Sequence, residues 1–274
     1  MVLSGSRPVV TARYPAASAA IVTGHGQALG KFLEGLHLIR AVVVDDELLA
    51  REELEALLAE YGEISVVGTC ANAIQAIRTI KSTRPDVVFL DIQMPKLDGL
   101  KMLSMIDADI MPCVIFVTAY DEYAIQAFEK NAIDYLLKPI QPDRLARAIV
   151  RLKRFLGEGR TPQYDSPLIE RIPCMGSQSI KLIDTSEVEF VRSSEMGVHV
   201  VTAKGEFLTE LTLTVLEAKT RHLVRCHKQF LVNIRQIDEI IRQDPSTALL
   251  KTRSGKQVPV SRRFLVHLKE LLGI

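Results

Sequence analysis

The sequence lacks the features that mark secreted, zinc-binding or membrane-spanning proteins. Its four cysteines lie far apart, with no Cys-x-x-Cys pair and no histidine at zinc-finger spacing, so we expect reduced thiols and no zinc site. No run of eighteen apolar residues occurs, and we therefore predict no membrane span. Residues 1–37 lack the basic-then-apolar order of a signal peptide. We expect them to form a poorly ordered extension of a cytoplasmic protein.

The chain also has little net charge. The formal value is only +1 at pH 7, so no overall field points to a polyanionic partner. The two halves differ, because residues 38–157 carry 14 Lys/Arg against 18 Asp/Glu, whereas residues 169–274 carry 16 against 12. The resulting net charges, −4 and +4, favour a nucleic-acid partner for the second half.

Residues 38–157 alternate between short apolar runs and amphipathic segments. The apolar runs predict strands at 39–44, 64–70, 86–91, 113–119 and 132–139. Helical spacing of apolar residues is clear at 47–61 and 73–83. Five βα units with nearly continuous apolar strands predict an α/β domain, a doubly wound, flavodoxin-like parallel sheet covered on both faces. In such a sheet the ligand lies beyond the carboxyl ends of the strands.

The pattern changes after a Gly- and Pro-containing linker at 158–168. Residues 169–274 contain short alternating runs, and Lys204-Gly205 and Ser254-Gly255 are typical of hairpin turns. The expected strands are SIKLI, VEFVRS, GVHVV, EFLTEL, FLVNI, IDEIIR, ALLKT and QVPV. Only 214–220 and 262–272 have a helical pattern. We predict a second, mainly antiparallel β domain.

Polar residues follow the predicted strands of the first domain: Asp45, Asp46, Asp91, Thr118 and Lys138. Three carboxylates make a hard oxygen site suited to Mg²⁺. A hydroxyl and an ammonium can neutralise phosphoryl oxygens, and phosphoryl transfer needs little beyond positioning and electrostatics. An aspartate can be the nucleophile that keeps the phosphoryl group. Each residue alone has a simpler interpretation, as a turn acid, a β-former or a surface charge, but the combination favours a phosphoryl site.

The motifs VVVDDE, FLDIQMPKLDG, VTAYDE and DYLLKPI resemble the receiver-domain signature in order and spacing over about residues 38–157. The resemblance implies that Asp91 is the phosphoacceptor. The implied Mg²⁺ ligands are Asp46, Asp91 and the carbonyl of Gln93, with Asp45 assisting through water. The implied phosphoryl-binding and switch residues are Thr118, Tyr135 and Lys138, although a half-buried strand tyrosine is also normal. A cis bond before Pro139 is implied as well.

The second half resembles the LytTR family of β-sheet DNA-binding domains over about residues 169–274. The resemblance rests on IDTSEVEFVRSSEMGVHVVT, LVRCHKQFLVNI and VPVSRRFLVHLKEL, and with the receiver it is similar to the pyruvate-responsive BtsR/YehT type of regulator. LytTR domains insert loops into the DNA grooves. The resemblance implies DNA contacts at His227, Lys228, Arg262 and Arg263, and a third contact region near 193–199.

The residues themselves agree with DNA contact. An arginine pair that opens the last helix can contact guanine and phosphate, Lys228 can contact phosphate, and neutral His227 can contact a base edge. Alternatively, the pair forms a solvated face and His227 only caps or packs. Positive charge at a helix N-terminus opposes the helix dipole, which favours a functional reason for Arg262 and Arg263.

Together these observations predict a cytoplasmic response regulator. A sensor histidine kinase would phosphorylate Asp91, the phosphorylated protein would form a homodimer, and two output domains would bind repeated half-sites in double-stranded DNA. We expect no enzymatic activity beyond the receiver's own phosphoryl transfer and dephosphorylation. One alternative is an interaction module whose β domain binds protein or RNA. Another is an aspartate-nucleophile phosphatase, but its DxDxT loop is absent because Ile-Gln-Met-Pro follows Asp91.

Overall fold

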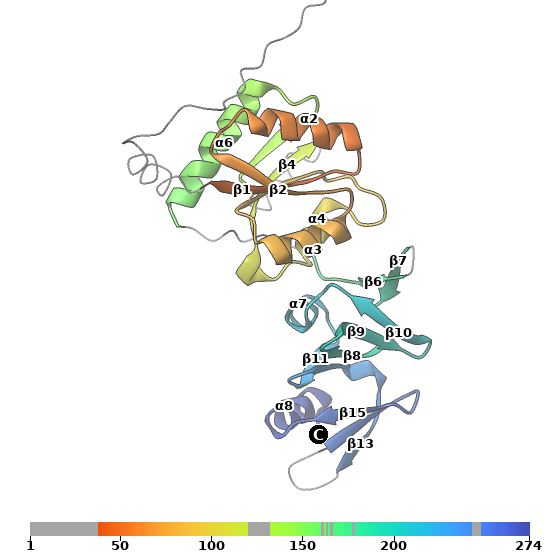
Figure 1. The fold of residues 1–274 in the computed structure, drawn as a ribbon. Helices are drawn as coiled ribbons and strands as arrows, with labels where there is room; N and C mark the ends of the chain where they lie inside the picture. The colour runs from red at the N-terminus through yellow and green to blue at the C-terminus, as the bar shows by residue number, and fades with distance from the viewer. Residues whose placement is uncertain are drawn as a thin grey trace, which may run out of the picture. The chain divides into compact units, whose positions relative to one another are not determined.

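The structure is a computed structural model, and it describes residues 38–119, 132–159, 162, 164, 167–176, 179–242 and 248–274. The extension expected at 1–37 lies outside the described residues. Residues 38–159 and 167–274 form separate sheets and are described in turn (Figure 1).

A five-stranded parallel sheet in the order β2-β1-β3-β4-β5 forms the centre of the first half. Its strands are β1 (Ile39–Val44), β2 (Ile64–Cys70), β3 (Val87–Leu90), β4 (Cys113–Thr118) and β5 (Asp134–Leu137). Strands β3 and β4 are buried along their whole length, which is why their sequences are uninterrupted apolar runs. The predicted doubly wound parallel sheet is confirmed.

Helices cover both faces of this sheet (Figure 1). The described helices are α2 (Leu48–Ala59), α3 (Ala73–Thr83), α4 (Gly99–Leu103) and α6 (Pro142–Gly157), with a 3-10 turn at Ala108–Ile110. Alternate residues of β1 enter opposite cores: Val42 packs with Ile77 of α3, whereas Val43 packs with Leu58 of α2. Asn72 caps α3 by accepting a hydrogen bond from the backbone of Gln75 at 3.0 Å.

The second half consists of two antiparallel sheets. The larger has the order β11-β12-β8-β9-β10-β6-β7 and the smaller the order β13-β14-β15. The strands are β6 (Arg171–Met175), β7 (Ile180–Asp184), β8 (Val188–Ser194), β9 (Gly197–Thr202), β10 (Gly205–Thr209), β11 (Leu223–His227), β12 (Phe230–Asn233), β13 (Ile237–Arg242), β14 (Ala248–Thr252) and β15 (Gln257–Val260). The helices are α7 (Leu213–Lys219) and α8 (Arg262–Leu272), and a 3-10 turn spans Ile234–Gln236.

An apolar core joins the two sheets to α8. It includes Phe190 and Val201 from the larger sheet, Leu250 and Val258 from the smaller sheet, and Leu268 from α8. The predicted mainly antiparallel β domain and both hairpin turns are confirmed, with positive φ at the glycine of each turn.

Two strands were missed by the sequence prediction. β6 contains Pro173, a residue type that is rare inside sheets, but β6 pairs with β10 at only one position and behaves almost as an edge strand. β11 has a register shift between Arg225 and His227, and this bulge breaks the alternation on which the prediction depended. Within the part of the chain that the structure describes, no helix is long and apolar enough to cross a membrane.

Candidate functional site

Three carboxylates gather at the carboxyl end of the parallel sheet. Asp45 and Asp46 follow β1, and Asp91 follows the adjacent strand β3. One oxygen from each of the three carboxylates lies within 4.8 Å of the others. Asp45 and Asp91 are buried, with 4% and 6% of their surface exposed, whereas Asp46 is exposed. The structure therefore brings the three predicted acids into one half-open pocket.

Lys138 lies in the same pocket at the end of β5. Its Nζ is 2.6 Å from Oδ2 of Asp45 and 2.8 Å from Oδ2 of Asp91. Burial lowers the pKa of Lys138, but the two carboxylates outweigh this effect and the pKa is raised above its usual value. Burial also raises the pKa of Asp45, against the opposing effect of Lys138. One ammonium pairs with two of the three carboxylates, so the cluster keeps a net negative charge that favours a bound cation.

Backbone amides orient two of the carboxylates. The amide of Gln93 donates to Oδ1 of Asp91 at 3.1 Å, and the amide of Glu47 donates to Oδ1 of Asp45 at 2.9 Å. The start of α4 approaches closely because residue 99 is glycine: a Cβ there would lie 2.4 Å from the carbonyl oxygen of Asp91. The sequence motif around Asp91 therefore has a steric reason for its glycine.

Thr118 lies on β4, next to β3 in the sheet, and Tyr135 lies on β5, next to β4. Thr118 ends β4 and is fully buried, and its Oγ1 has no hydrogen-bond partner among the described residues. The backbone amide of Lys138 donates to the carbonyl of Thr118 at 2.9 Å, which holds the two residues side by side. Tyr135 is 6% exposed and pairs with Phe116 across the β4–β5 ladder. The Lys138–Pro139 peptide bond is cis, as the receiver resemblance implied.

The four predicted DNA-contact residues lie at one edge of the second domain. His227 ends β11 and Lys228 follows it in the β11–β12 turn, and Arg262 and Arg263 open α8. The amide of Ser261, just before α8, donates to the carbonyl of Cys226 at 3.0 Å. This bond holds the start of α8 against the end of β11, so the two basic pairs are neighbours. Lys228 and both arginines are exposed.

The third predicted region adjoins the same edge. The amide of Ser193, near the β8–β9 turn, donates to the carbonyl of Gln229 at 2.8 Å. His227 accepts a hydrogen bond at Nδ1 from the amide of Gln229 at 3.2 Å. Because Nδ1 is occupied as an acceptor, Nε2 is the ring nitrogen that remains to donate to another group. Three turns that are far apart in the sequence form one continuous edge.

Other residues of this edge are structural. Arg225 pairs with Glu217 at 2.8 Å and also donates to the carbonyl of Lys228, in agreement with a supporting role. Cys226 is buried, and burial raises the pKa of its thiol to about 12. Gln229 was missed by sequence reasoning, because it acts through its backbone and no side-chain signal marks it. A second residue that was missed, the buried Glu189, had a signal in its charge within an apolar strand.

Comparison with known proteins agrees with both halves. The model of the response regulator receiver domain matches residues 41–150, and that of the LytTr DNA-binding domain matches residues 178–273. A response regulatory protein of Vibrio cholerae is 50% identical over 236 residues, covering 86% of this chain and 99% of the relative.

Two further relatives carry a functional name. The transcriptional regulatory protein BtsR of Salmonella typhimurium is 48% identical over 244 residues, and that of Escherichia coli K12 is 46% identical over 244 residues. Each match covers 86% of this chain and 100% of the relative. The two matched domains, a receiver and a LytTr DNA-binding domain, are those of a regulator. The chain belongs to the two-component response regulators that join a receiver domain to a LytTR DNA-binding domain.

Proposed function

We propose that Asp91 accepts a phosphoryl group from a sensor histidine kinase and that this reaction controls sequence-specific binding of the LytTR domain to DNA, and thereby transcription. The observation that carries the proposal is the cluster around Asp91, where Lys138 and two further carboxylates lie beside a carboxylate that is buried and 6% exposed. We retain the domain division 38–157, 158–168 and 169–274, supported by α6 ending at Gly157 and β6 beginning at Arg171.

The proposed Mg²⁺ ligands are Asp46, Asp91 and the carbonyl of Gln93, with Asp45 assisting through water. Three carboxylate oxygens within 4.8 Å of one another, balanced by one ammonium, fit a small divalent cation that prefers oxygen ligands. When bound, the ion neutralises charge on the phosphoryl oxygens. The residues' own part is to hold Oδ1 of Asp91 in a fixed orientation through the amide of Gln93.

Thr118 and Lys138 are the proposed phosphoryl-binding residues. A buried hydroxyl without a partner is unfavourable by about 1–3 kcal/mol, and a phosphoryl oxygen on Asp91 would supply the missing acceptor. The ammonium of Lys138 would leave the Asp91 carboxylate and form an ion pair with the phosphoryl group instead. Tyr135, on the strand next to Thr118, is the proposed switch aromatic that follows the movement of Thr118.

The edge of the LytTR domain that carries His227, Lys228, Arg262 and Arg263, here called the basic edge, is the proposed DNA-binding surface. Arg262 and Arg263 would contact bases and phosphates, Lys228 a phosphate, and Nε2 of His227 a base acceptor. Two phosphorylated chains would form a homodimer on repeated half-sites. The proposal places the protein in the cytoplasm, where bacterial transcription takes place, and limits its catalysis to its own phosphoryl transfer and dephosphorylation.

Selection of bound duplexes from random DNA tests the proposed function directly. We expect the phosphorylated protein to enrich one repeated sequence. Recovery of no preferred duplex, with retained binding to RNA or protein, would show that the output domain has another partner.

Substitutions at the basic edge distinguish residues that contact phosphates from residues that recognise bases. Lys228→Ala is expected to weaken binding to every duplex and to lower the slope of log affinity against log salt by about one. Arg262→Ala or Arg263→Ala, for at least one of the two, is expected to cost about 1–3 kcal/mol and to relax preference at one base pair. Titrations of selected and scrambled duplexes over a salt series measure both effects.

The control is Lys204→Ala, which removes an exposed cation in the β9–β10 turn, at the opposite end of β9 from the β8–β9 turn. It should leave both affinities unchanged within about twofold. Equal and sequence-independent losses at Lys228, Arg262 and Arg263 would reduce the arginine pair to a phosphate clamp.

A further inference from the structure

Glu189 is a buried carboxylate within β8 of the LytTR domain. Only 3% of its surface is exposed, and the neighbouring side chains of Val188 and Phe190 enter apolar cores. The pairing of β8 with β9 shifts register between Val188 and Phe190, so Glu189 is the additional residue of a β-bulge. The bulge leaves its side chain free to reach the smaller sheet.

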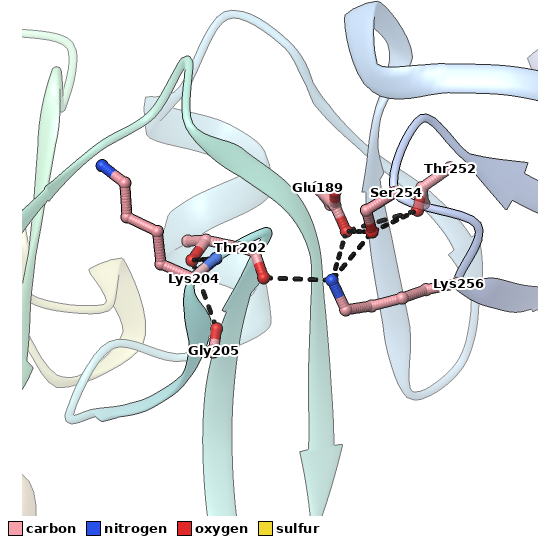
Figure 2. Close-up of polar contacts among 7 residues, drawn as sticks. All are labelled: Glu189, Thr202, Lys204, Gly205, Thr252, Ser254 and Lys256. Carbon is pink, nitrogen blue, oxygen red and sulfur yellow. Dashed lines mark hydrogen bonds and ion pairs between the residues drawn. The ribbon is translucent and has the colours of Figure 1, made fainter.

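One carboxylate oxygen of Glu189 accepts three hydrogen bonds from side chains at the β14–β15 hairpin (Figure 2). Its Oε2 accepts hydrogen bonds from Oγ of Ser254 at 2.7 Å, Nζ of Lys256 at 2.9 Å and Oγ1 of Thr252 at 3.2 Å. Thr252 ends β14, and Ser254 and Lys256 lie in the turn between β14 and β15. Lys256 also donates to the carbonyl of Thr202, at the end of β9, at 3.1 Å. The turn is thereby tied to two strands of the larger sheet.

The carboxylate of Glu189 stays ionised in this environment. Burial by itself raises its pKa, but the hydrogen bonds from Lys256, Ser254 and Thr252 and the positive charge of Lys256 outweigh burial and hold the pKa below its usual value. A charged pair therefore lies at the junction of the two sheets.

The pair need not contribute much stability. Desolvation of the Glu189 carboxylate, whose side chain is 4% exposed, offsets much of its attraction to Lys256, whose side chain is 36% exposed. Replacing buried ion pairs with apolar residues is often neutral or stabilising. The sheets already share an apolar core that includes Phe190, Leu250 and Val258. The pair adds a fixed orientation of the two sheets relative to each other. A short charge-assisted hydrogen bond permits one geometry, whereas apolar contacts permit several.

The two strands that the pair holds together extend to the basic edge. β8 runs from Glu189 to the β8–β9 turn at 194–197, which adjoins the β11–β12 turn. β15 runs from the turn containing Lys256 to Ser261 and then directly into Arg262 and Arg263. The pair thus joins two strands at one end, and the other ends of the same strands carry the two groups of proposed DNA-contact residues.

We propose that Glu189 and Lys256 are positioning residues for DNA recognition: by locking the β14–β15 turn to β8, they set where Arg262 and Arg263 lie relative to His227 and Lys228. The inference rests on the proposed function. Base readout requires side chains placed within a hydrogen-bond length of their targets, whereas phosphate contacts tolerate small displacements. Loss of the pair therefore lowers affinity for the selected sequence more than affinity for unrelated DNA.

The same end of the domain provides a matched control pair. Lys204 and Glu187 form an ion pair of 2.9 Å with side chains 71% and 47% exposed. Both residues belong to turns of the larger sheet, and Figure 2 shows Lys204 directed away from the β14–β15 turn. Lys204→Met removes the same charge as Lys256→Met from the same region without touching the link between the sheets.

The test uses the full chain with Glu189→Gln, Lys256→Met, the apolar pair Glu189→Leu with Lys256→Met, and the control Lys204→Met. Affinities are titrated on the duplex selected by the wild-type protein and on a scrambled duplex. The three pair variants are expected to lose about tenfold on the selected duplex and less than about twofold on the scrambled one. Lys204→Met is expected to change both by less than about twofold.

Thermal unfolding accompanies every titration. The apolar pair variant is expected to unfold at the wild-type temperature or above while still losing selectivity, a combination that a merely structural role would not produce. Ser254→Ala removes one donor to Glu189 at an exposed position, so we expect it to retain the fold. It replaces any pair variant that proves unstable. It should lower the preference for the selected duplex by a smaller factor than the pair variants do.

Three results would overturn the inference: unchanged selectivity in the apolar pair and Ser254→Ala variants, equal losses on both duplexes, or the same loss in Lys204→Met. If the wild-type protein itself selects no sequence, the proposed function fails and the inference fails with it. If the wild-type protein selects a sequence that the variants still prefer equally, only the inference is wrong.

Discussion

Asp91→Asn should abolish phosphoryl labelling of the protein by a small donor such as acetyl phosphate in the presence of Mg²⁺. The amide is isosteric with the carboxylate but lacks the nucleophilic oxygen, and it also removes one charge from the group of three acids. Oδ1 of Asp91 accepts from the amide of Gln93 and Oδ2 accepts from Lys138, so an asparagine, which has one acceptor oxygen, can keep only one of these two bonds. Mass spectrometry and acid-lability of the label measure the result.

A matched control is available seven residues further along the chain. Asp98 caps α4 by accepting a hydrogen bond from the amide of Lys101 at 2.7 Å, and asparagine can keep that cap. Asp98→Asn should therefore be labelled like the wild-type protein. Lys138→Ala should keep some labelling but separate it from DNA binding, because the nucleophile remains while the ammonium that senses the phosphoryl group is lost. Undiminished labelling of Asp91→Asn at another residue would contradict the assignment.

The second large effect concerns DNA with two half-sites. Phosphorylation should raise the affinity of the full chain for such a duplex by about 10²-fold, since a paired second domain binds at a high effective concentration. On a single half-site the gain should stay within about threefold, because a lone domain makes the same contacts in either state. Titration of both duplexes with and without phosphodonor gives the two ratios.

Asp91→Asn is the control for this experiment, and it should show no gain on either duplex. Analytical ultracentrifugation of the phosphorylated chain should show a dimer. If phosphorylation strengthens binding to one half-site as much as to two, the receiver acts by releasing a masked LytTR domain, and the dimerisation proposal is wrong.

The receiver fold was readable from the sequence because its physical determinants are local. A strand buried on both faces must be apolar at every position, and VVFL and CVIFVT show this directly. Parallel strands also place their carboxyl ends at one edge of the sheet, so Asp45, Asp46 and Asp91 could be predicted to lie together before any coordinates were known.

The LytTR half was less readable because its strands are half-buried and interrupted. Pro173 and the bulge after Arg225 concealed β6 and β11, since both features break a pattern that depends on strict alternation. Tertiary pairing compensates for both interruptions: β6 bonds to β7 along its length, and β11 bonds to β12 on either side of its bulge.

Apolar periodicity and the order of the motifs in the sequence thus determined the two domain types, the cluster of acids at the carboxyl edge of the parallel sheet and the basic residues of the output domain. Only the tertiary structure decided that the turns near 193, 227 and 261 form one edge, because backbone bonds between Ser193 and Gln229 and between Ser261 and Cys226 join them. It also decided the partner of Glu189, which lies 67 residues away at Lys256. A charge in an apolar strand indicates that a partner must exist, but long-range packing alone selects which one, since no local pattern encodes contacts across that distance.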